Sequence, residues 1–256
     1  MERMMDGHRW WVLGLLAAAQ AMLVIDVTVV NVALPSIGTS LGLDRAALTW
    51  AVTAYTLLFG SLLLLGGRLA DSFGRRRVFL AGIATFVGAS LASGFALDGT
   101  WLVVARAGQG IGAALMSPAA LSIVTTTFSG PERTRALGVW SAVGGSGAAI
   151  GVALGGILTS GPGWQWIFFV NVPVGIVVAA GVVRFVASTR PEHRPGIDIA
   201  GAVAATVMFG ALLFGLINAG DAGWDDPSVL GPLAVALVAA VGFVAIERAV
   251  PAPLVR

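Results

Sequence analysis

The sequence contains no cysteine, and charged residues make up only 11% of its 256 positions. Without cysteine, the chain can form neither disulfide bonds nor thiolate metal sites. Soluble globular proteins carry about 25% charged residues, so the shortage of charge excludes this class of protein. Hydrophobic residues account for 57% of the chain. The composition therefore predicts an integral membrane protein.

Lysine is also missing, so all fifteen basic residues are arginines. In a soluble protein, such a set could indicate nucleic-acid binding. Here the arginines stand mostly at the ends of apolar runs, where anionic lipid headgroups and the excess of basic residues in cytoplasmic loops account for them. We therefore expect the lipid bilayer as a partner of these residues, and no nucleic acid.

Signatures of catalysis and of metal binding are scarce. The zinc-protease pattern His-Glu-x-x-His does not occur, and no pair of aspartates is placed for catalysis. Residues 108–113 match the dinucleotide pattern Gly-x-Gly-x-x-Ala, but that pattern requires a preceding strand in a βαβ unit. His8 and His193 lie in polar segments, which favours solvated side chains. We predict that the chain is not an enzyme and that it binds no metal or cofactor.

Apolar runs long enough to cross a bilayer, which takes about 20 residues per helix, occur eight times. They cover residues 10–34, 46–65, 78–97, 101–124, 136–158, 166–186, 199–217 and 229–246. This pattern predicts an all-α integral membrane protein with about eight transmembrane helices. An aspartate precedes several of these runs, where a carboxylate can cap free backbone N–H groups. The predicted caps are Asp44, Asp98, Asp198 and Asp226.

The arginines are distributed unevenly between the two sides of this predicted array. Thirteen of them lie in segments on the side of the N-terminus, whereas the opposite loops contain only Arg45. Basic residues accumulate in short cytoplasmic loops of membrane proteins. We therefore predict a multi-pass protein of the plasma (inner) membrane with both termini in the cytoplasm.

One polar segment, residues 188–196, has the composition of a long loop because it combines two prolines and a glycine with polar residues. We predict that this segment is a cytoplasmic linker. It divides the chain into a six-helix unit, residues 1–187, and a two-helix appendage, residues 197–256.

Two of the predicted helices contain a charged residue well inside their apolar runs, each accompanied by an amide. Asp26 and Asn31 lie in the first run, and Arg106 and Gln109 lie in the fourth. Burying a charge in a bilayer is costly, so these side chains should face a cavity or one another. Counting residues from the expected outer ends of both runs places Asp26 and Arg106 within reach of each other. We assign these four residues to a proton-coupling site or substrate cavity, with Asp26 as its protonatable group; the alternative for Asp26 is a purely structural hydrogen bond between helices.

A short charged loop, residues 66–77, lies between the second and third runs. Within it, Gly74 can adopt φ > 0, and Asp71 can pair with neighbouring arginines. We predict a gating loop at the cytoplasmic end of the helices; a basic membrane anchor is the alternative. The residues assigned to this loop are Gly67, Asp71, Gly74, Arg75 and Arg76.

The fifth run contains Gly147, Gly151 and Gly155, at every fourth position. This spacing places small residues on one face of a helix, where the backbone of another helix can approach closely. We predict that these glycines form a helix-packing face.

Three of these segments resemble signatures of one transporter family, the major facilitator superfamily. Residues 67–76, Gly-x-Leu-Ala-Asp-x-x-Gly-Arg-Arg, resemble its loop between the second and third helices, with Ser72 where a basic residue is usual. Residues 106–112, Arg-x-x-Gln-Gly-x-Gly, are similar to its fourth-helix motif. Residues 26–35, Asp-x-Thr-Val-Val-Asn-Val-Ala-Leu-Pro, closely resemble the first-helix signature of its fourteen-helix drug:proton antiporters.

The resemblance implies a six-helix N-terminal bundle followed by the two extra helices of that branch. It also implies a secondary transporter that exports small lipophilic or drug-like molecules and uses the proton gradient, rather than a cofactor, as its energy source. The resemblance covers only about the first half of the family's architecture, so the chain looks truncated. We therefore expect a missing C-terminal half, or another copy of the chain, as a partner. The alternative is a non-transporting membrane scaffold or a regulatory remnant of such a transporter.

Overall fold

The computed structural model describes residues 2–188 and 199–250, and all regular structure in these ranges is helical. The helices are α1 (Glu2–Leu41), α2 (Arg45–Phe73), α3 (Arg75–Gly94), α4 (Gly99–Thr127), α5 (Gly130–Ser160), α6 (Trp166–Phe169), α7 (Asn171–Phe185), α8 (Ile199–Ala222) and α9 (Pro227–Ala249). Eight segments of the described chain are long and apolar enough to span a membrane. The predicted all-α membrane fold with about eight spans is therefore confirmed.

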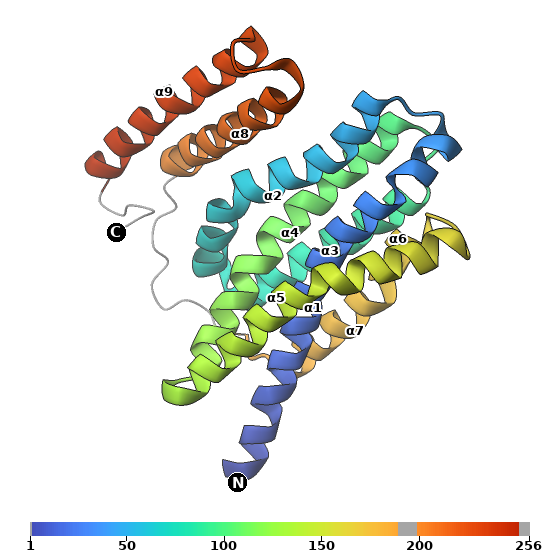
Figure 1. Ribbon diagram of the computed structural model, residues 1–256. Coiled ribbons are helices and arrows are strands. Elements are labelled where there is room, and N and C mark those ends of the chain that lie inside the picture. The colour runs from blue at the N-terminus through green and yellow to red at the C-terminus, as the bar shows by residue number, and fades with distance from the viewer. Residues whose placement is uncertain (1, 189–198, 251–256) are drawn as a thin grey trace.

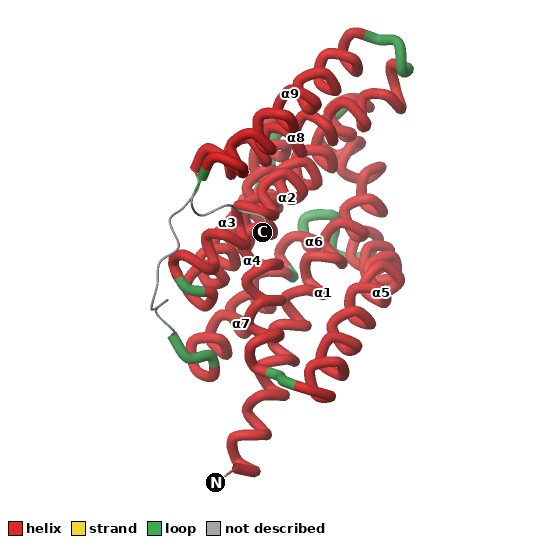
Figure 2. Tube along the Cα trace, turned by 90° about the vertical axis from the view of Figure 1, so that its left-hand side faces the viewer, coloured by secondary structure: helices red, strands yellow, loops and turns green. Residues whose placement is uncertain are grey.

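Helices α1 to α7 form an elongated bundle, and α8 and α9 form a hairpin beside it (Figures 1 and 2). In the bundle, α4 contacts α1, α2, α3 and α5, and α1 contacts α2, α4, α5, α6 and α7. The two helices predicted to carry the buried charges, α1 and α4, are also the two most buried spans of the described chain. Their polar side chains can meet partners from several helices at once.

Glycines allow α4 to lie unusually close to α2 and α3. A Cβ atom at Gly66 of α2 would lie 2.0 Å from the carbonyl oxygen of Ala114, and one at Gly110 of α4 would lie 2.5 Å from the carbonyl oxygen of Tyr55. On the other side of α4, a Cβ atom at Gly112 would lie 2.6 Å from the backbone nitrogen of Phe86. Backbone contacts of this kind are typical of small residues at helix interfaces in membranes. They fix the position of α4 relative to α2 and α3.

Two helix boundaries differ from the prediction. The first helix does not end near residue 34 but continues through Pro35 to Leu41. The sixth run consists of two helices, because α6 ends at Phe169 and α7 begins at Asn171, although together they form one span. Pro173 has no backbone N–H to donate to the carbonyl of Phe169, which accounts for the break. The break makes Asn171 the first residue of α7, and this residue belongs to the polar cluster described below.

The predicted aspartate caps are present at every helix N-terminus where the structure describes them. Asp44, Asp98 and Asp226 each accept a hydrogen bond of 2.8 Å from the backbone N–H of Ala47, Trp101 and Ser228, respectively. These three predicted caps are therefore confirmed. Asp198 lies outside the described residues. So does most of the predicted linker, including His193.

The α8–α9 hairpin contacts the bundle through one helix. Among the described elements, α8 contacts α2 and α9, whereas α9 contacts only α8. At the α2–α8 interface, the rings of Trp50 and Phe214 lie 5.7 Å apart, and Leu213 packs over Gly60. The hairpin therefore lies at the side of the bundle and leaves most of α9 exposed.

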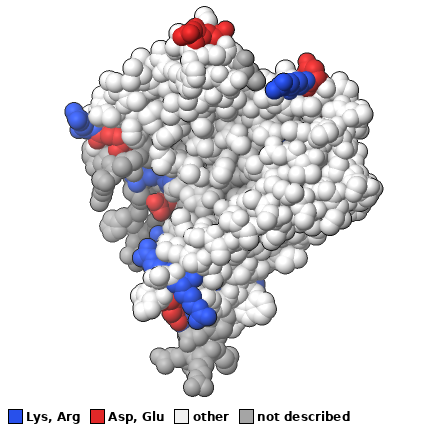
Figure 3. Space-filling model, in the orientation of Figure 1, with Lys and Arg blue, Asp and Glu red and all other residues white. Residues whose placement is uncertain are grey.

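Charged side chains lie at opposite ends of the helices on the face shown in Figure 3, and a broad uncharged area separates them. This is the distribution that a bilayer requires, since charged side chains are excluded from the hydrocarbon core. The exceptions are two buried charges, and they form the site described next.

Candidate functional site

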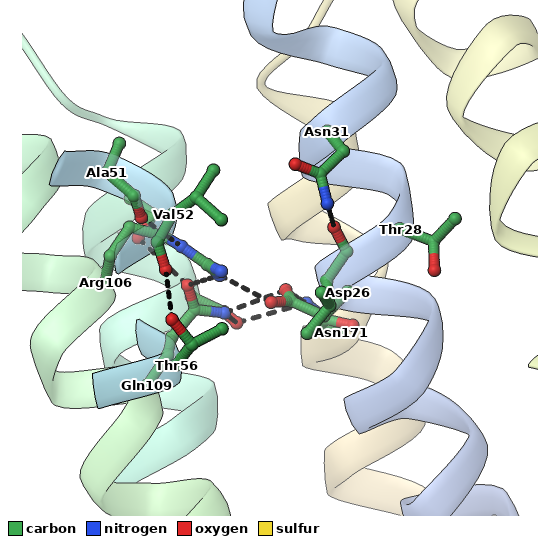
Figure 4. Close-up of polar contacts among 12 residues, drawn as sticks. Asp26, Thr28, Asn31, Ala51, Val52, Thr56, Arg106, Gln109 and Asn171 are labelled. Carbon is green, nitrogen blue, oxygen red and sulfur yellow. Dashed lines mark hydrogen bonds and ion pairs between the residues drawn. The ribbon is translucent and has the colours of Figure 1, made fainter. Parts of the chain in front are cut away.

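A cluster of buried polar side chains joins four helices of the bundle, and Figure 4 shows most of its members. Its centre is Asp26 of α1, which accepts a hydrogen bond of 2.5 Å at Oδ2 from Nη1 of Arg106 on α4. Both side chains are only 1% exposed. Nε2 of Gln109 and Nδ2 of Asn171 each donate to Oδ1 of Asp26 at 2.9 Å. One guanidinium and two amides therefore hold the carboxylate.

Two serines of α3 extend the cluster. Ser90 Oγ accepts hydrogen bonds from Nε2 of Gln109 at 2.6 Å and from Nδ2 of Asn171 at 3.2 Å. Ser93 Oγ donates to Oε1 of Gln109 at 3.4 Å, and the same oxygen accepts from Nη1 of Arg106 at 2.8 Å. Gln109 thus contacts both charges and both serines.

Arg106 also has partners on α2. Its Nε donates to the carbonyl oxygen of Ala51 at 3.1 Å. Its Cζ lies 4.4 Å from the ring centroid of Tyr55 and 6.0 Å from that of Phe168. A cation above an aromatic face is attracted by the ring quadrupole, most strongly where water is excluded. The guanidinium is therefore held by α2 as well as by Asp26.

The cluster lies between two apolar cores. Along α1, Asp26 stands between Leu23, which belongs to the larger core, and Val29, which belongs to the smaller one. Along α4, Arg106 stands in the same way between Leu102 and Ala113. Apolar surroundings strengthen an ion pair and make an unpaired charge costly, so losing either partner is expected to be strongly destabilising.

Three of the four residues predicted for this site, Asp26, Arg106 and Gln109, come together in the structure. Asn31 does not join them. Its side chain is exposed, and its Nδ2 donates to the carbonyl oxygen of Val27 on the same helix at 2.9 Å, as Figure 4 shows. Its proposed place at a substrate cavity stays a prediction.

Sequence reasoning missed several members of the cluster, namely Ala51, Tyr55, Ser90, Ser93 and Asn171. Asn171 carried a signal, because it is an amide inside the otherwise apolar sixth span. Serines are common in membrane helices, and Ala51 contributes only its backbone carbonyl. These residues could not be assigned to the cluster without the packing of the helices.

The predicted gating loop connects α2 to α3. Gly74 forms the turn with φ 96°, the conformation expected for it, and is buried. Asp71 is exposed and lies 4.0 Å from Nε of Arg75, while Nη2 of Arg76 donates to the carbonyl oxygen of Val183 on α7 at 2.8 Å. Gly67 lies next to Pro118 of α4. The loop thus links α2, α3 and α7, and its gating role stays a prediction.

The predicted glycine face of α5 packs against α1. Gly147, Gly151 and Gly155 are all buried, and Cβ atoms added to them would lie 2.7–3.0 Å from side-chain atoms of Val24, Thr28 and Val32, respectively. This face is therefore occupied within the bundle. It is not free to bind a second copy of the chain.

A pattern found in hydrolases, Gly-x-Ser-x-Gly, occurs at residues 38–42. It lies at the C-terminal end of α1 and not on the strand-to-helix turn that this pattern requires in hydrolases. Among the described residues, no group of three or more histidine, aspartate or glutamate side chains could hold a metal ion.

Comparison with known proteins gives one consistent result. Residues 16–252 match the sequence profile of the Major Facilitator Superfamily. The chain is 43% identical to the puromycin resistance protein pur8 of Streptomyces alboniger, over 97% of this chain and 50% of the relative. It is 44% identical to the cephamycin export protein CmcT of Amycolatopsis lactamdurans, over 94% and 50% of the two chains. The chain thus spans about half the length of these curated relatives.

Solved structures agree with this fold. The chain superposes on a crystal structure of the peptide transporter POT in complex with sulfate with a TM-score of 0.68, at 17% identity, over 94% of this chain and 52% of the transporter. It superposes on a bacterial homolog of the human lysosomal transporter Spinster with a TM-score of 0.58, at 22% identity, over 91% and 60%. Together with the family match over residues 16–252, these findings show that the chain belongs to the Major Facilitator Superfamily, a family of transporters and not of enzymes.

Proposed function

We propose that this chain forms one half of a proton-coupled exporter of small drug-like molecules, in which Asp26 carries the coupled proton. The buried contact between Asp26 and Arg106 is the observation that carries the proposal. Among the side chains whose burial the structure describes, Asp26 is the only buried acidic one. Ionisable residues inside membrane spans mark ion pathways and proton relays.

The ion pair supplies a physical basis for coupling. While Asp26 is charged, its attraction to Arg106 holds α1 against α4. A proton on Asp26 removes the negative charge and weakens this contact, so the two protonation states favour different helix arrangements. Secondary transporters alternate between arrangements of this kind around a site near the membrane midplane. The proton gradient is then the energy source, and no cofactor is required.

Drug-like substrates follow from the relatives rather than from the geometry. Two of the similar proteins are named for resistance to puromycin and to lincomycin, and a third for the export of cephamycin. We therefore propose small antibiotics, or molecules of similar size, as substrates. Rocking of one bundle against another also needs a second bundle, so we propose a further six-helix half as the chain's partner.

Efflux from cells tests this proposal. The chain is co-expressed with the part of the puromycin-resistance relative that the match does not cover, and accumulation of puromycin is measured with and without an uncoupler. We expect uncoupler-sensitive efflux that Asp26→Asn abolishes and Asp26→Glu partly retains. Asp226→Asn, the same chemical change at an exposed cap, serves as the matched control and should leave efflux unchanged.

Two results would contradict the proposal. Uncoupler-sensitive efflux in Asp26→Asn would show that another group carries the proton. No efflux in any combination, from protein that is folded and inserted, would favour the alternative of a non-transporting scaffold or regulatory remnant.

We further propose that both termini lie in the cytoplasm, because the arginines concentrate on that side. The absence of native cysteine makes the test direct. A single cysteine at Asn218 or Asp225 should react with an impermeant thiol reagent applied to intact cells, and a cysteine at Arg133 should react only after permeabilisation. The reverse pattern would overturn this orientation.

A further inference from the structure

Apart from Gln109, which bonds to both charges, the partners of Asp26 and of Arg106 fall into separate sets. Asp26 accepts from Gln109 and Asn171 in addition to Arg106. Arg106 donates to the carbonyl of Ala51 and lies over the ring of Tyr55, and neither group touches Asp26 through any hydrogen bond in the described structure. If the ion pair opens, each charge therefore keeps partners of its own.

We propose that Tyr55 is a positioning residue that competes with Asp26 for the guanidinium of Arg106 and holds it in place when Asp26 takes up a proton. The inference rests on the proposed function, because it concerns the same proton site. In this role, the ring of Tyr55 on α2 helps to set the pH at which Asp26 takes up a proton.

The physical argument begins with the cost of an unpaired buried charge. A proton on Asp26 leaves Arg106, only 1% exposed, without an anion beside it. This state is accessible only if neutral groups compensate the cation. The Ala51 carbonyl and the Tyr55 ring face, 4.4 Å from Cζ, are placed to do so. Both belong to α2 and lie four residues apart, on one face of the helix.

The helix packing keeps Tyr55 and Arg106 together. A Cβ atom at Gly110 would lie 2.5 Å from the carbonyl oxygen of Tyr55, so the backbones of α2 and α4 are in direct contact at this level. Asp26 instead lies on α1, whose most extensive contact is with α5, across the glycine face of that helix. A separation of α1 from α4 would therefore remove Asp26 from Arg106 but leave the tyrosine ring where it is.

The aromatic ring of Tyr55, and not its hydroxyl, makes the proposed contact with Arg106. Tyr55 is 1% exposed, and its hydroxyl has no hydrogen-bond partner among the described residues. A phenylalanine would retain the aromatic face and remove an unsatisfied polar atom, which is not expected to be destabilising. The hydroxyl can therefore be deleted without disturbing the proposed contact.

Few other groups can titrate near this pair. The described side chains that hydrogen-bond to the two charges or place a ring over the cation are Tyr55 from α2, Gln109 from α4, Phe168 from α6 and Asn171 from α7. Ser90 and Ser93 of α3 bond to the amides. Apart from the pair itself, only the tyrosine is titratable, and only at strongly alkaline pH. A pH-dependent carboxylic-acid signal from this site therefore reports Asp26.

Infrared spectroscopy of the chain in nanodiscs reads this protonation directly and needs no transport activity. The carbonyl stretch of protonated Asp26 is isolated as the part of the pH-dependent spectrum that Asp26→Asn removes. We expect Tyr55→Leu to shift the half-protonation point to more acidic pH by about one unit, a tenfold weaker proton affinity or about 1.4 kcal/mol. Removing the competing ring strengthens the ion pair and so opposes proton uptake.

Two matched variants separate the ring's electrostatics from its packing. Tyr55→Phe should titrate like the wild-type chain. Phe59→Leu removes the aromatic side chain that packs on Tyr55 at 5.9 Å and does not contact Arg106, and it should also leave the titration unchanged. A series of increasingly fluorinated phenylalanines introduced at position 55 keeps the shape and weakens the ring face stepwise, so it should produce a stepwise acidic shift even if Tyr55→Leu does not fold.

An unchanged titration across the fluorinated series would overturn the inference, and so would an equal shift in Phe59→Leu. Failure of the proposed function looks different. In that case Asp26→Asn would retain proton-driven efflux, while the infrared shift in the Tyr55 variants would still be observed.

Discussion

Helices α4 and α9 both span the membrane, but they differ in what surrounds them. Within the described residues, α4 contacts four helices and carries Arg106 and Gln109, both buried. α9 contacts only α8, and most of its apolar side chains are exposed. A helix that meets only lipid needs little more than apolar residues, whereas a helix enclosed by others can hold charges if each has a partner. The site therefore lies where the bundle is most tightly enclosed.

The largest effect is expected at the centre of the α4 cluster. Arg106→Ala leaves Asp26 buried without its cation, which costs about 3–5 kcal/mol when the carboxylate stays charged. We expect a strongly lowered midpoint of thermal unfolding in detergent. Adding Asp26→Asn to Arg106→Ala should recover much of the loss, because the double variant has no unpaired charge. Additive losses would mean that the two side chains do not interact.

A second prediction compares glycines in enclosed and in open surroundings. Gly66→Ala places a Cβ atom 2.0 Å from the carbonyl oxygen of Ala114 and should force α2 away from α4, at about 3 kcal/mol, the upper end of the usual range for overpacking. Gly242→Ala in α9 meets no atom within 4 Å and should stabilise that helix by up to about 1 kcal/mol. Unfolding midpoints that move in the same direction for both variants would contradict the comparison.

Two of the turns that contain a glycine with positive φ offer a smaller contrast. Gly74 has φ 96° and is buried between α2 and α3, whereas Gly223 has φ 88° in the exposed turn between α8 and α9. A β-branched residue strains either backbone by about 1–3 kcal/mol. We expect Gly74→Val to lower the unfolding midpoint more than Gly223→Val, because the exposed turn can relax. An equal decrease would show that the α2–α3 loop is as free as the outer turn.

The smallest effect concerns the cap of α9. Hydrogen bonds from Ser228 lower the pKa of Asp226 below its usual value of 3.8. The cap's contribution is therefore fully present above about pH 4 and is lost as the pH falls through the lowered pKa. Amide hydrogen exchange in the first turn of α9 should accelerate only below that range. The Asp226→Asn variant should show no such pH dependence, since asparagine caps without titrating.

The sequence predicted this fold and the core of this site for reasons that the structure makes visible. Eight apolar spans, three aspartate caps and the meeting of Asp26 with Arg106 follow from local composition and from the cost of burying charge. The Ala51 carbonyl, Ser90 and the extension of α1 to Leu41 were missed, because they depend on helix contacts that leave no local pattern. Asn171 was recoverable, since it is a lone amide in an apolar span.

Proton release on substrate binding tests the central claim most directly. The chain is purified together with the second half used in the efflux experiment, and puromycin is added in weakly buffered solution containing a pH-sensitive dye. We predict that the wild-type complex releases protons on binding the drug, and that Asp26→Asn binds the drug without releasing any. The same proton release from Asp26→Asn as from the wild-type complex would contradict the assignment of Asp26 as the proton carrier.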